Sequence, residues 1–214
     1  NGLCAAKAAL SDLGEVVVVM HGTTNDDICT IHRGTKVRKM HTSRRDAFQT
    51  IGDEIAGTVT YPSLEVSLAS HAVKRGTNEL ALMDKLEEKC AIVWYYPGMD
   101  PAILSAWKGY RGIVLVGTGL GHVGTHMVGS IREMSKAGTT FVMVSQCLHG
   151  RVCDRVYDTG RDLLSAGVIE GEDMLPEVAL VKLMWVLGNS SSQEEVRRMM
   201  GSNLAGEIKW RSSE

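Results

Sequence analysis

Residues 112–124 read GIVLVGTGLGHVG, an unbroken apolar run that leads into a glycine-rich turn. An apolar run without polar alternation is typical of a strand that is buried on both faces of a parallel sheet. We expect a helix over 125–135, directly after the turn, and another strand over 140–145. Strands that alternate with helices of roughly ten residues predict right-handed βαβ crossovers within a parallel sheet.

The same alternation extends on both sides of this stretch. Upstream, 91–96 is predicted as a strand, and Asp100 followed by Pro101 favours a helix start, because Asp caps a first turn and Pro fits its first position. Downstream, the pattern predicts three helices, over 158–166, 175–187 and 193–200. We therefore expect 90–214 to form one α/β domain.

The residues before this domain follow a less regular pattern. A helix is expected over 3–13, and the valine-rich run 15–20 resembles a further strand buried in a parallel sheet. Residues 61–89 mix turn residues with short apolar runs, so we interpret them as a linker that follows the end of a first domain, 1–60. Because the sequence lacks an initiator Met and opens on a helix, we expect it to be the C-terminal part of a longer protein.

The composition is that of a globular protein with an aliphatic core. Hydrophobic residues make up 44% of the chain and charged residues 22%, while aromatic residues contribute only 5%. The net charge of −2 gives no global electrostatic argument for nucleic-acid binding, so any RNA contact is expected to be local or made by a partner. No apolar run reaches the roughly 18 residues that a membrane helix needs.

Five cysteines are scattered along the chain without a Cys-x-x-Cys pair. Together with the lack of a recognisable secretory signal, this pattern indicates reduced thiols in a cytoplasmic protein. Cys147, His149 and Cys153 lie close in sequence but lack a ligand spacing known for zinc, so no metal site is expected.

The glycine-rich turn, 117–124, has three interpretations. Its later glycines have the Gly-x-Gly-x-x-Gly spacing of a dinucleotide fingerprint, but Ser145 and Gln146 occupy the place, about 20 residues on, where an acidic residue is expected. In the second interpretation the glycines only serve a tight strand-to-helix turn. In the third, backbone amides and His122 line a small polar-ligand site or a subunit contact.

A second candidate site is the basic segment 36–48, KVRKMHTSRRDAF, which ends on an aromatic residue, Phe48. A lysine among other cations is less stable in its ammonium form, and such a lysine can act as a base or orient a nucleophile. The alternative is an ordinary basic surface loop, which residue types alone favour.

In a third segment, 155–167, Tyr157 and Arg161 either face an interface or belong to a capped helix with ordinary surface charge.

Six stretches together resemble the asparaginase/glutaminase family, and they span nearly the whole chain. They are VVVVMHGTTNDD, IHRGTKVRKMHTSRRDAF, GIVLVGTGLGHV, QCLHGRV, VYDTGRDLLSAGVI and MLPEVALVKLMWVLG. Within that family, the form KMHTSRRDAF is most similar to the glutaminase subunits of archaeal-type glutamyl-tRNA(Gln) amidotransferases. The resemblance implies a three-layer α/β/α, parallel-sheet fold, of which the chain holds the end of the first domain and the complete, smaller second domain.

The resemblance also implies an amide-hydrolysing mechanism that releases ammonia through a threonine nucleophile. A second threonine, an aspartate and a lysine support that nucleophile, and Lys39 stands at the family's lysine position. The family's Thr-Gly-Gly-Thr segment and Thr-Asp pair do not occur in the 214 residues, so the nucleophile is expected upstream of them. Amide hydrolysis of this kind is expected to need no cofactor.

In this family the second domain of a neighbouring subunit completes each active site, which implies a homodimer or a higher oligomer. The turn with Thr118 and His122 matches that region, although Leu120 stands where some bacterial asparaginases have asparagine. Tyr157 is a further candidate for substrate or subunit contact. A tRNA-binding partner subunit is expected to perform the ATP- and Mg-dependent step on Glu-tRNA(Gln), so that contact with tRNA is indirect.

Two alternatives stay open at this point. In the first, the parent protein is a stand-alone L-asparaginase, because the resemblance does not distinguish whether glutamine or asparagine is the substrate. In the second, the chain as given is a non-catalytic oligomerisation module, since two of the three catalytic motifs are missing from it. The strand at 15–20 would then lack neighbours, which favours association between chains.

Overall fold

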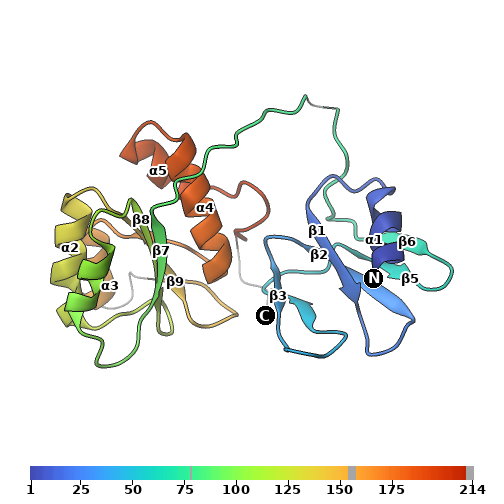
Figure 1. The fold of residues 1–214 in the computed structure, drawn as a ribbon, viewed down its shortest axis with the longest axis horizontal. Coiled ribbons are helices and arrows are strands. Elements are labelled where there is room, and N and C mark those ends of the chain that lie inside the picture. The colour runs from blue at the N-terminus through green and yellow to red at the C-terminus, as the bar shows by residue number, and fades with distance from the viewer. Residues whose placement is uncertain (78, 154–157, 211–214) are drawn as a thin grey trace. The chain divides into compact units, whose positions relative to one another are not determined.

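The computed structural model describes residues 1–77, 79–153 and 158–210 (Figure 1). The chain divides into two compact units, Asn1–Ala81 and a second unit that begins at Leu82. None of the helices in the described part of the chain has the length and apolar character that crossing a lipid bilayer requires.

The second unit is built on a parallel sheet of four strands. The strands are β7 (Cys90–Trp94), β8 (Gly112–Gly117), β9 (Thr140–Ser145) and β10 (Ile169–Glu170), in the order β10-β9-β8-β7. Ile113 of β8 lies opposite Ala91 on one side and Phe141 on the other. All six residues of β8 are buried, as an unbroken apolar run in a covered parallel sheet requires. The prediction of a parallel sheet is therefore confirmed.

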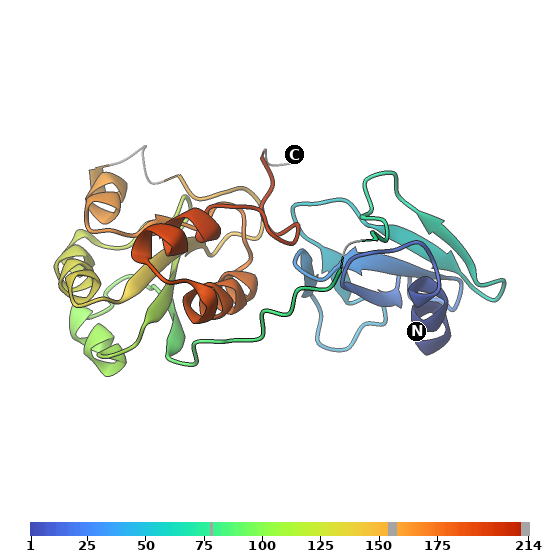
Figure 2. The same ribbon diagram turned by 90° about the horizontal axis from the view of Figure 1, so that it is seen from above.

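Helices cover both faces of this sheet and make three layers (Figures 1 and 2). On one side lie η1 (Pro101–Trp107), η2 (Thr125–Met127), α2 (Val128–Lys136) and α3 (Asp158–Ser165), and on the other lie α4 (Pro176–Asn189) and α5 (Gln193–Met200). Ile113 and Leu115 face the first layer, whereas Val114 and Val116 face the second, because successive strand residues point to opposite faces.

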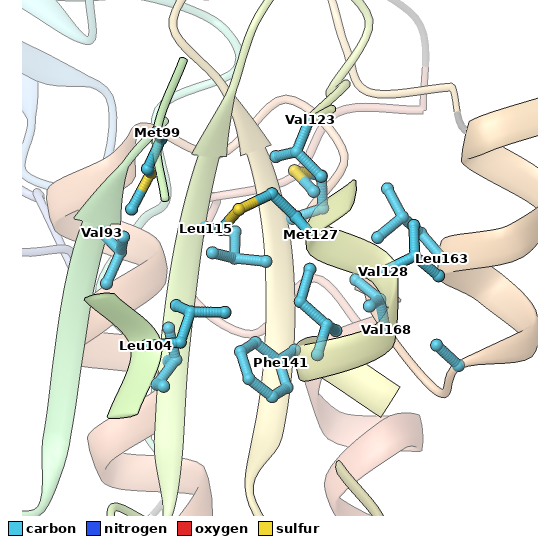
Figure 3. Packing of buried hydrophobic residues seen from close by; sticks show 14 of the residues in the cluster. Val93, Met99, Leu104, Leu115, Val123, Met127, Val128, Phe141, Leu163 and Val168 are labelled. Atoms are coloured by element: carbon cyan, nitrogen blue, oxygen red, sulfur yellow. The ribbon is translucent and has the colours of Figure 1, made fainter. Parts of the chain in front are cut away.

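The core between the sheet and the first layer is aliphatic, as the composition indicated, and it also contains Met99, Met127 and Met143. Figure 3 shows Leu115 and Phe141 of the sheet packed against Leu104, Met127 and Leu163 of the covering helices. Each of these side chains is at most 1% exposed. Burial of one such side chain stabilises the fold by about 1.5–3 kcal/mol.

Capping residues set where two of the helices begin. Asp100 accepts a hydrogen bond from the backbone of Ala102 at 2.8 Å, and Pro101 follows at the first helical position. The resulting helix, η1, is a 3₁₀ helix. Ser192 accepts a hydrogen bond from the backbone of Glu195 at 3.2 Å, which fixes the first turn of α5.

The first unit contains an antiparallel sheet and a short helix. Its main strands are β1 (Val17–His21), β2 (Ile28–Arg33), β5 (Gly57–Thr60) and β6 (Glu65–Leu68), in the order β1-β2-β5-β6. A separate two-stranded ribbon consists of β3 (Val37–Lys39) and β4 (Phe48–Thr50). The helix α1 (Gly2–Ala9) packs its buried Cys4 and Ala8 against the sheet, together with Val19 and Ile31.

The orientation of the valine-rich strand differs from the prediction. The run 15–20 was expected in a parallel sheet, but β1 pairs antiparallel with β2 and only Val19 in it is buried. The reason is the short turn between the two strands, since antiparallel neighbours can be joined by a tight turn whereas parallel neighbours need a long crossover. The strand does have a neighbour on one side, so the expectation that it lacks neighbours is also wrong.

The segment expected as a linker, 61–89, begins with regular structure. Glu65–Leu68 forms β6 and pairs with β5, so the sheet of the first unit continues beyond residue 60. Only Val66 and Leu68 of β6 are partly buried, while Glu65 and Ser67 are exposed. A strand of four residues at a sheet edge has too short an alternation to stand out from the turn residues around it.

Candidate functional site

Lys39 lies at the end of β3, in the ribbon that β3 and β4 form. It stands opposite Phe48 across the ribbon, and its side chain is exposed. The backbone of Met40 donates to the carbonyl of Ala47 at 2.7 Å and continues the pairing by one further bond. The ribbon therefore holds the backbone of Lys39 while its ammonium group extends into solvent.

The base of the ribbon is fixed from two directions. His32 Nδ1 lies 2.8 Å from Thr50 Oγ1 and joins β2 to β4. The backbone of Ile51 donates to the carbonyl of Lys36 at 2.8 Å, and the side chain of Lys36 is fully buried. Because His32, Lys36 and Ile51 are buried, the packed part of the unit holds the backbone of Lys39 in place.

A buried charge cluster holds the end of β2 just before the ribbon. Arg33 Nε lies 2.5 Å from Glu15 Oε2, and Arg33 Nη1 lies 2.8 Å from Asp53 Oδ2. The hydrogen bond to Glu15, followed by the charges of Glu15 and Asp53, raises the pKa of Arg33 above its usual value against the effect of burial. Glu15 also accepts a hydrogen bond from the backbone of Val73 at 3.0 Å, so the cluster ties four segments together.

The turn HGTTNDD lies against the basic segment through its acidic residues. Asp26 Oδ1 lies 2.6 Å from Arg45 Nη2 and 3.0 Å from His21 Nε2. The hydrogen bond with His21, aided by Arg45, lowers the pKa of Asp26. A hydrogen bond from Thr23 at 2.5 Å likewise lowers the pKa of Asp27. The sequence predicted these residues only as a turn, because the contact joins loops that belong to two separate sheets.

The basic segment itself is folded back by local hydrogen bonds. His41 Nδ1 accepts from the backbones of Ser43 and Arg44 at 3.1 and 3.0 Å. Arg44 binds both carboxylate oxygens of Asp46, at 2.8 and 2.6 Å. Lys39, in contrast, forms no ion pair with any of the residues that the structure describes. Arg44 and Arg45 are thus paired with carboxylates, whereas Lys39 is exposed and has no such partner among the described residues.

The glycine-rich turn of the second unit is a tight backbone loop after β8. Thr118 and His122 exchange backbone hydrogen bonds, each 2.9 Å long. Gly121 has φ +101°, and a Cβ there would lie 2.8 Å from the side chain of Val152. A Cβ at Gly117 would meet the backbone nitrogen of His122 at 2.9 Å. Glycine is therefore required by the close approach of the backbone, which supports the tight-turn interpretation.

Residues at the carboxyl end of β9 hold this turn in place. Ser145 Oγ donates to the carbonyl of Gly119 at 2.5 Å. Gln146 Nε2 donates to the carbonyls of Tyr95 and Val116 at 2.5 and 3.1 Å. In a dinucleotide site, a carboxylate would stand at the position of these two side chains. Here Ser145 and Gln146 instead form hydrogen bonds that join the carboxyl ends of β7, β8 and β9. The geometry thus gives no support to nucleotide binding.

The sequence-predicted residues fall into both units. Lys39 belongs to the first unit, and Thr118 and His122 belong to the second. Thr118 is exposed, and His122 is half-buried. Tyr157 lies outside the described residues. Over the ranges that the structure describes, no three His, Cys, Asp or Glu side chains are grouped so that they could hold a metal ion.

Models of two protein domains match the chain. The model described as "Asparaginase, N-terminal" matches residues 1–72, and "Glutaminase/Asparaginase C-terminal domain" matches residues 89–200. The chain belongs to the asparaginase/glutaminase family. The family resemblance read from the sequence is therefore confirmed.

Curated relatives of this family are similar along the whole chain. A glutamyl-tRNA(Gln) amidotransferase subunit from Archaeoglobus fulgidus is 58% identical over 210 residues, which cover 97% of this chain and 50% of that protein. The corresponding proteins of Methanosarcina mazei and Pyrococcus horikoshii are 56% and 53% identical, with 97% of this chain and 49% and 48% of those proteins covered. The chain spans about half the length of the curated relatives it matches.

Solved structures of the family share the fold. The thermostable L-asparaginase from Thermococcus kodakarensis matches with a TM-score of 0.85 and 32% identity, over 98% of this chain and 62% of that chain. L-asparaginase I from Vibrio cholerae matches with a TM-score of 0.74 and 26% identity, over 84% of this chain and 55% of that chain. The asparaginase-like α/β fold predicted from the sequence is thus confirmed.

Proposed function

We propose that this chain is part of the glutaminase subunit of a tRNA-dependent amidotransferase that converts Glu-tRNA(Gln) to Gln-tRNA(Gln). The observation that carries the proposal is the 51–58% identity to glutamyl-tRNA(Gln) amidotransferase proteins over 97% of the chain. The L-asparaginase of Thermococcus kodakarensis, by comparison, is 32% identical. In this role the protein hydrolyses the side-chain amide of glutamine and releases ammonia for the amidation step.

The proposed reaction uses a threonine nucleophile that is not among the 214 residues. The threonine oxygen attacks the amide carbon, ammonia leaves, and water hydrolyses the resulting ester to glutamate and free threonine. Lys39 acts on the nucleophile through charge and hydrogen bonding, and favours loss of the hydroxyl proton. Support for this role comes from its exposed position on a fixed ribbon, where it has no described carboxylate partner.

The proposal includes a division of labour between subunits. Amide hydrolysis by a threonine nucleophile needs no cofactor, whereas activation of the Glu-tRNA(Gln) carboxylate needs ATP and Mg, which belong to a partner subunit. The glycine-rich turn with Thr118 and His122 serves substrate or subunit contact in a homodimer or a higher homo-oligomer. Its exposed position at the carboxyl ends of parallel strands supports that role, because ligands bind at this edge of α/β sheets.

The rival function is a stand-alone L-asparaginase, which the structural likeness to two L-asparaginases favours. The two functions differ in substrate and in dependence on a partner. The polypeptide that contains these 214 residues should be purified with and without the candidate tRNA-binding subunit, and ammonia release from glutamine and from asparagine should be measured.

The amidotransferase function predicts a stable complex with the tRNA-binding subunit, hydrolysis of glutamine within it, and formation of Gln-tRNA(Gln) when ATP is present. Hydrolysis of asparagine well above that of glutamine, by a protein that does not retain the partner, would instead establish the asparaginase function.

A further inference from the structure

Four exposed cations surround two neighbouring hollows of the second unit. Lys108 and Arg111 line a hollow of about 310 Å³, and Lys136 and Arg197 line another of about 300 Å³. The two hollows share three lining residues, Gly138, Thr139 and Gln193, so they form one continuous surface.

This surface lies at the amino ends of the parallel strands. Arg111 directly precedes β8, Thr139 precedes β9, and Gly167 comes shortly before β10. The glycine-rich turn follows the carboxyl end of β8, so it occupies the opposite edge of the same sheet. A molecule bound at the cationic surface therefore leaves the candidate substrate edge free.

The cations line the two hollows without a carboxylate among the lining residues. Within the described ranges, none of the four cations forms an ion pair, and Arg197 donates only to the carbonyl of Gly167 at 2.7 Å. By contrast, the adjacent Arg198 lies 3.8 Å from Glu195. Although the net charge of the chain is −2, these two adjoining hollows therefore carry four cations that form no ion pair with a described residue.

The floor of the surface allows a ligand to approach the backbone. Gly109 and Gly138 have φ of +85° and +102°, and no atom lies within 4 Å of where their Cβ would be. The hydroxyls of Thr139 and Thr140 donate to the backbone carbonyl of Tyr110 and to the side chain of Gln193, at 2.8 and 3.3 Å. The lining therefore combines backbone, amide and cationic groups with the apolar side chains of Tyr110, Met134 and Ile169.

We propose that this surface binds the phosphate backbone of RNA, and the choice of RNA among polyanions rests on the proposed tRNA-dependent function. Lys and Arg side chains bind phosphates and release counterions, which makes such binding sensitive to salt. Proteins typically recognise structured RNA through its shape and its phosphates and not through the edges of its bases. The protein thus contributes a tRNA contact of its own besides that of the partner.

The test is binding of a fluorescently labelled tRNA(Gln) transcript to the polypeptide that contains these residues, without the partner subunit and over a series of salt concentrations. The double variant Arg111→Gln/Lys136→Gln is expected to bind about tenfold more weakly at low salt. The slope of log K against log salt should become shallower by about 1 for each cation removed. The matched control is Arg198→Gln, which removes one charge next to Arg197 and should keep both values within twofold.

Two outcomes overturn the proposal. One is an unchanged affinity and salt slope in the double variant, or an equal loss in the control. The other is displacement of the RNA by polyglutamate at equal charge concentration, which would mean that an acidic protein is the occupant. Glutamine hydrolysis measured without RNA should be the same in all variants, so failure of RNA binding and failure of the glutaminase function are separate results.

Discussion

At the scale of single residues, the cations near the ribbon differ in what holds them. Arg33 is held between the carboxylates of Glu15 and Asp53, which are largely shielded from solvent, and Arg45 is paired with Asp26 of the preceding turn. Lys39 has no such partner among the described residues, although it follows the fully buried Lys36 by only three positions. The two arginines are thus paired with carboxylates, as structural cations usually are, whereas the candidate functional lysine has no such partner among the described residues.

The ion pair between Lys182 and Glu207 is buried and should be costly to break. Its atoms lie 2.6 Å apart, with both side chains at most 6% exposed. Removal of one partner leaves an uncompensated buried charge, so Glu207→Ala is expected to lower the free energy of unfolding by about 3–5 kcal/mol. Urea unfolding of both variants measures this, and the control Lys182→Met/Glu207→Leu should lose much less. An equal loss in the two variants would contradict the account.

His32 should make the first unit sensitive to mild acid. Burial lowers its pKa, and within the described residues its Nε2 atom has no hydrogen-bond partner. Because the pKa is lower in the folded state, the stabilisation is complete above the unfolded value of about 6.5 and is lost as the pH falls below it. Urea unfolding at pH 7.5 and 5.5 should show a smaller loss of stability in His32→Asn than in the wild type. The same loss in both would rule out this residue as the cause.

At the scale of elements, the glycine-rich turn offers a matched pair of glycines. Gly121→Ala combines a positive φ with a collision against Val152, so a loss of about 2–3 kcal/mol in the free energy of unfolding is expected. Gly119 has φ +53° and open space around its Cβ position, so Gly119→Ala should lose only about 1 kcal/mol. Thermal unfolding of both variants measures the difference. Equal losses would show that crowding at Gly121 does not matter.

The elements of the second unit could largely be predicted from the sequence, because their signals are local. The strand at 140–145 and the helix at 193–200 have the predicted bounds, and β8 coincides with the apolar run that begins at residue 112. Apolar runs, capping residues and glycine turns determine where a strand or helix begins and ends through residues that are only a few positions apart in sequence. The expected helix after Asp100 formed with a 3₁₀ geometry, which neither the cap nor the proline distinguishes from an α-helix.

The elements of the first unit could be predicted less well, because what decides them is remote in sequence. A run of valines fixes a strand but not the direction of its neighbour, so the antiparallel pairing of β1 was missed. The contact of Asp26 with Arg45 joins positions 19 residues apart. Lys39 was found only because the segment around it resembles a family, since its residue type alone favoured a surface loop.

At the scale of the whole molecule, the two units carry different candidate functional features. The second unit is a packed three-layer domain with a polar turn at one edge of its sheet and a cationic surface at the other. The first unit holds Lys39 but none of the family's threonine motifs. Under the proposed function, these 214 residues supply Lys39 and the glycine-rich turn, and the polypeptide that contains them supplies the nucleophile.

The central claim is that Lys39 serves amide hydrolysis, and the most direct measurement is ammonia release from glutamine by the polypeptide that contains this chain. The variant Lys39→Met should lower kcat by about a hundredfold or more, as expected for loss of a group that assists proton transfer. Its melting temperature should not change, because Lys39 is exposed and has no described ion pair. Lys7→Met, on the exposed face of α1, is the matched control and should keep full activity. Near wild-type ammonia release by Lys39→Met would contradict the account.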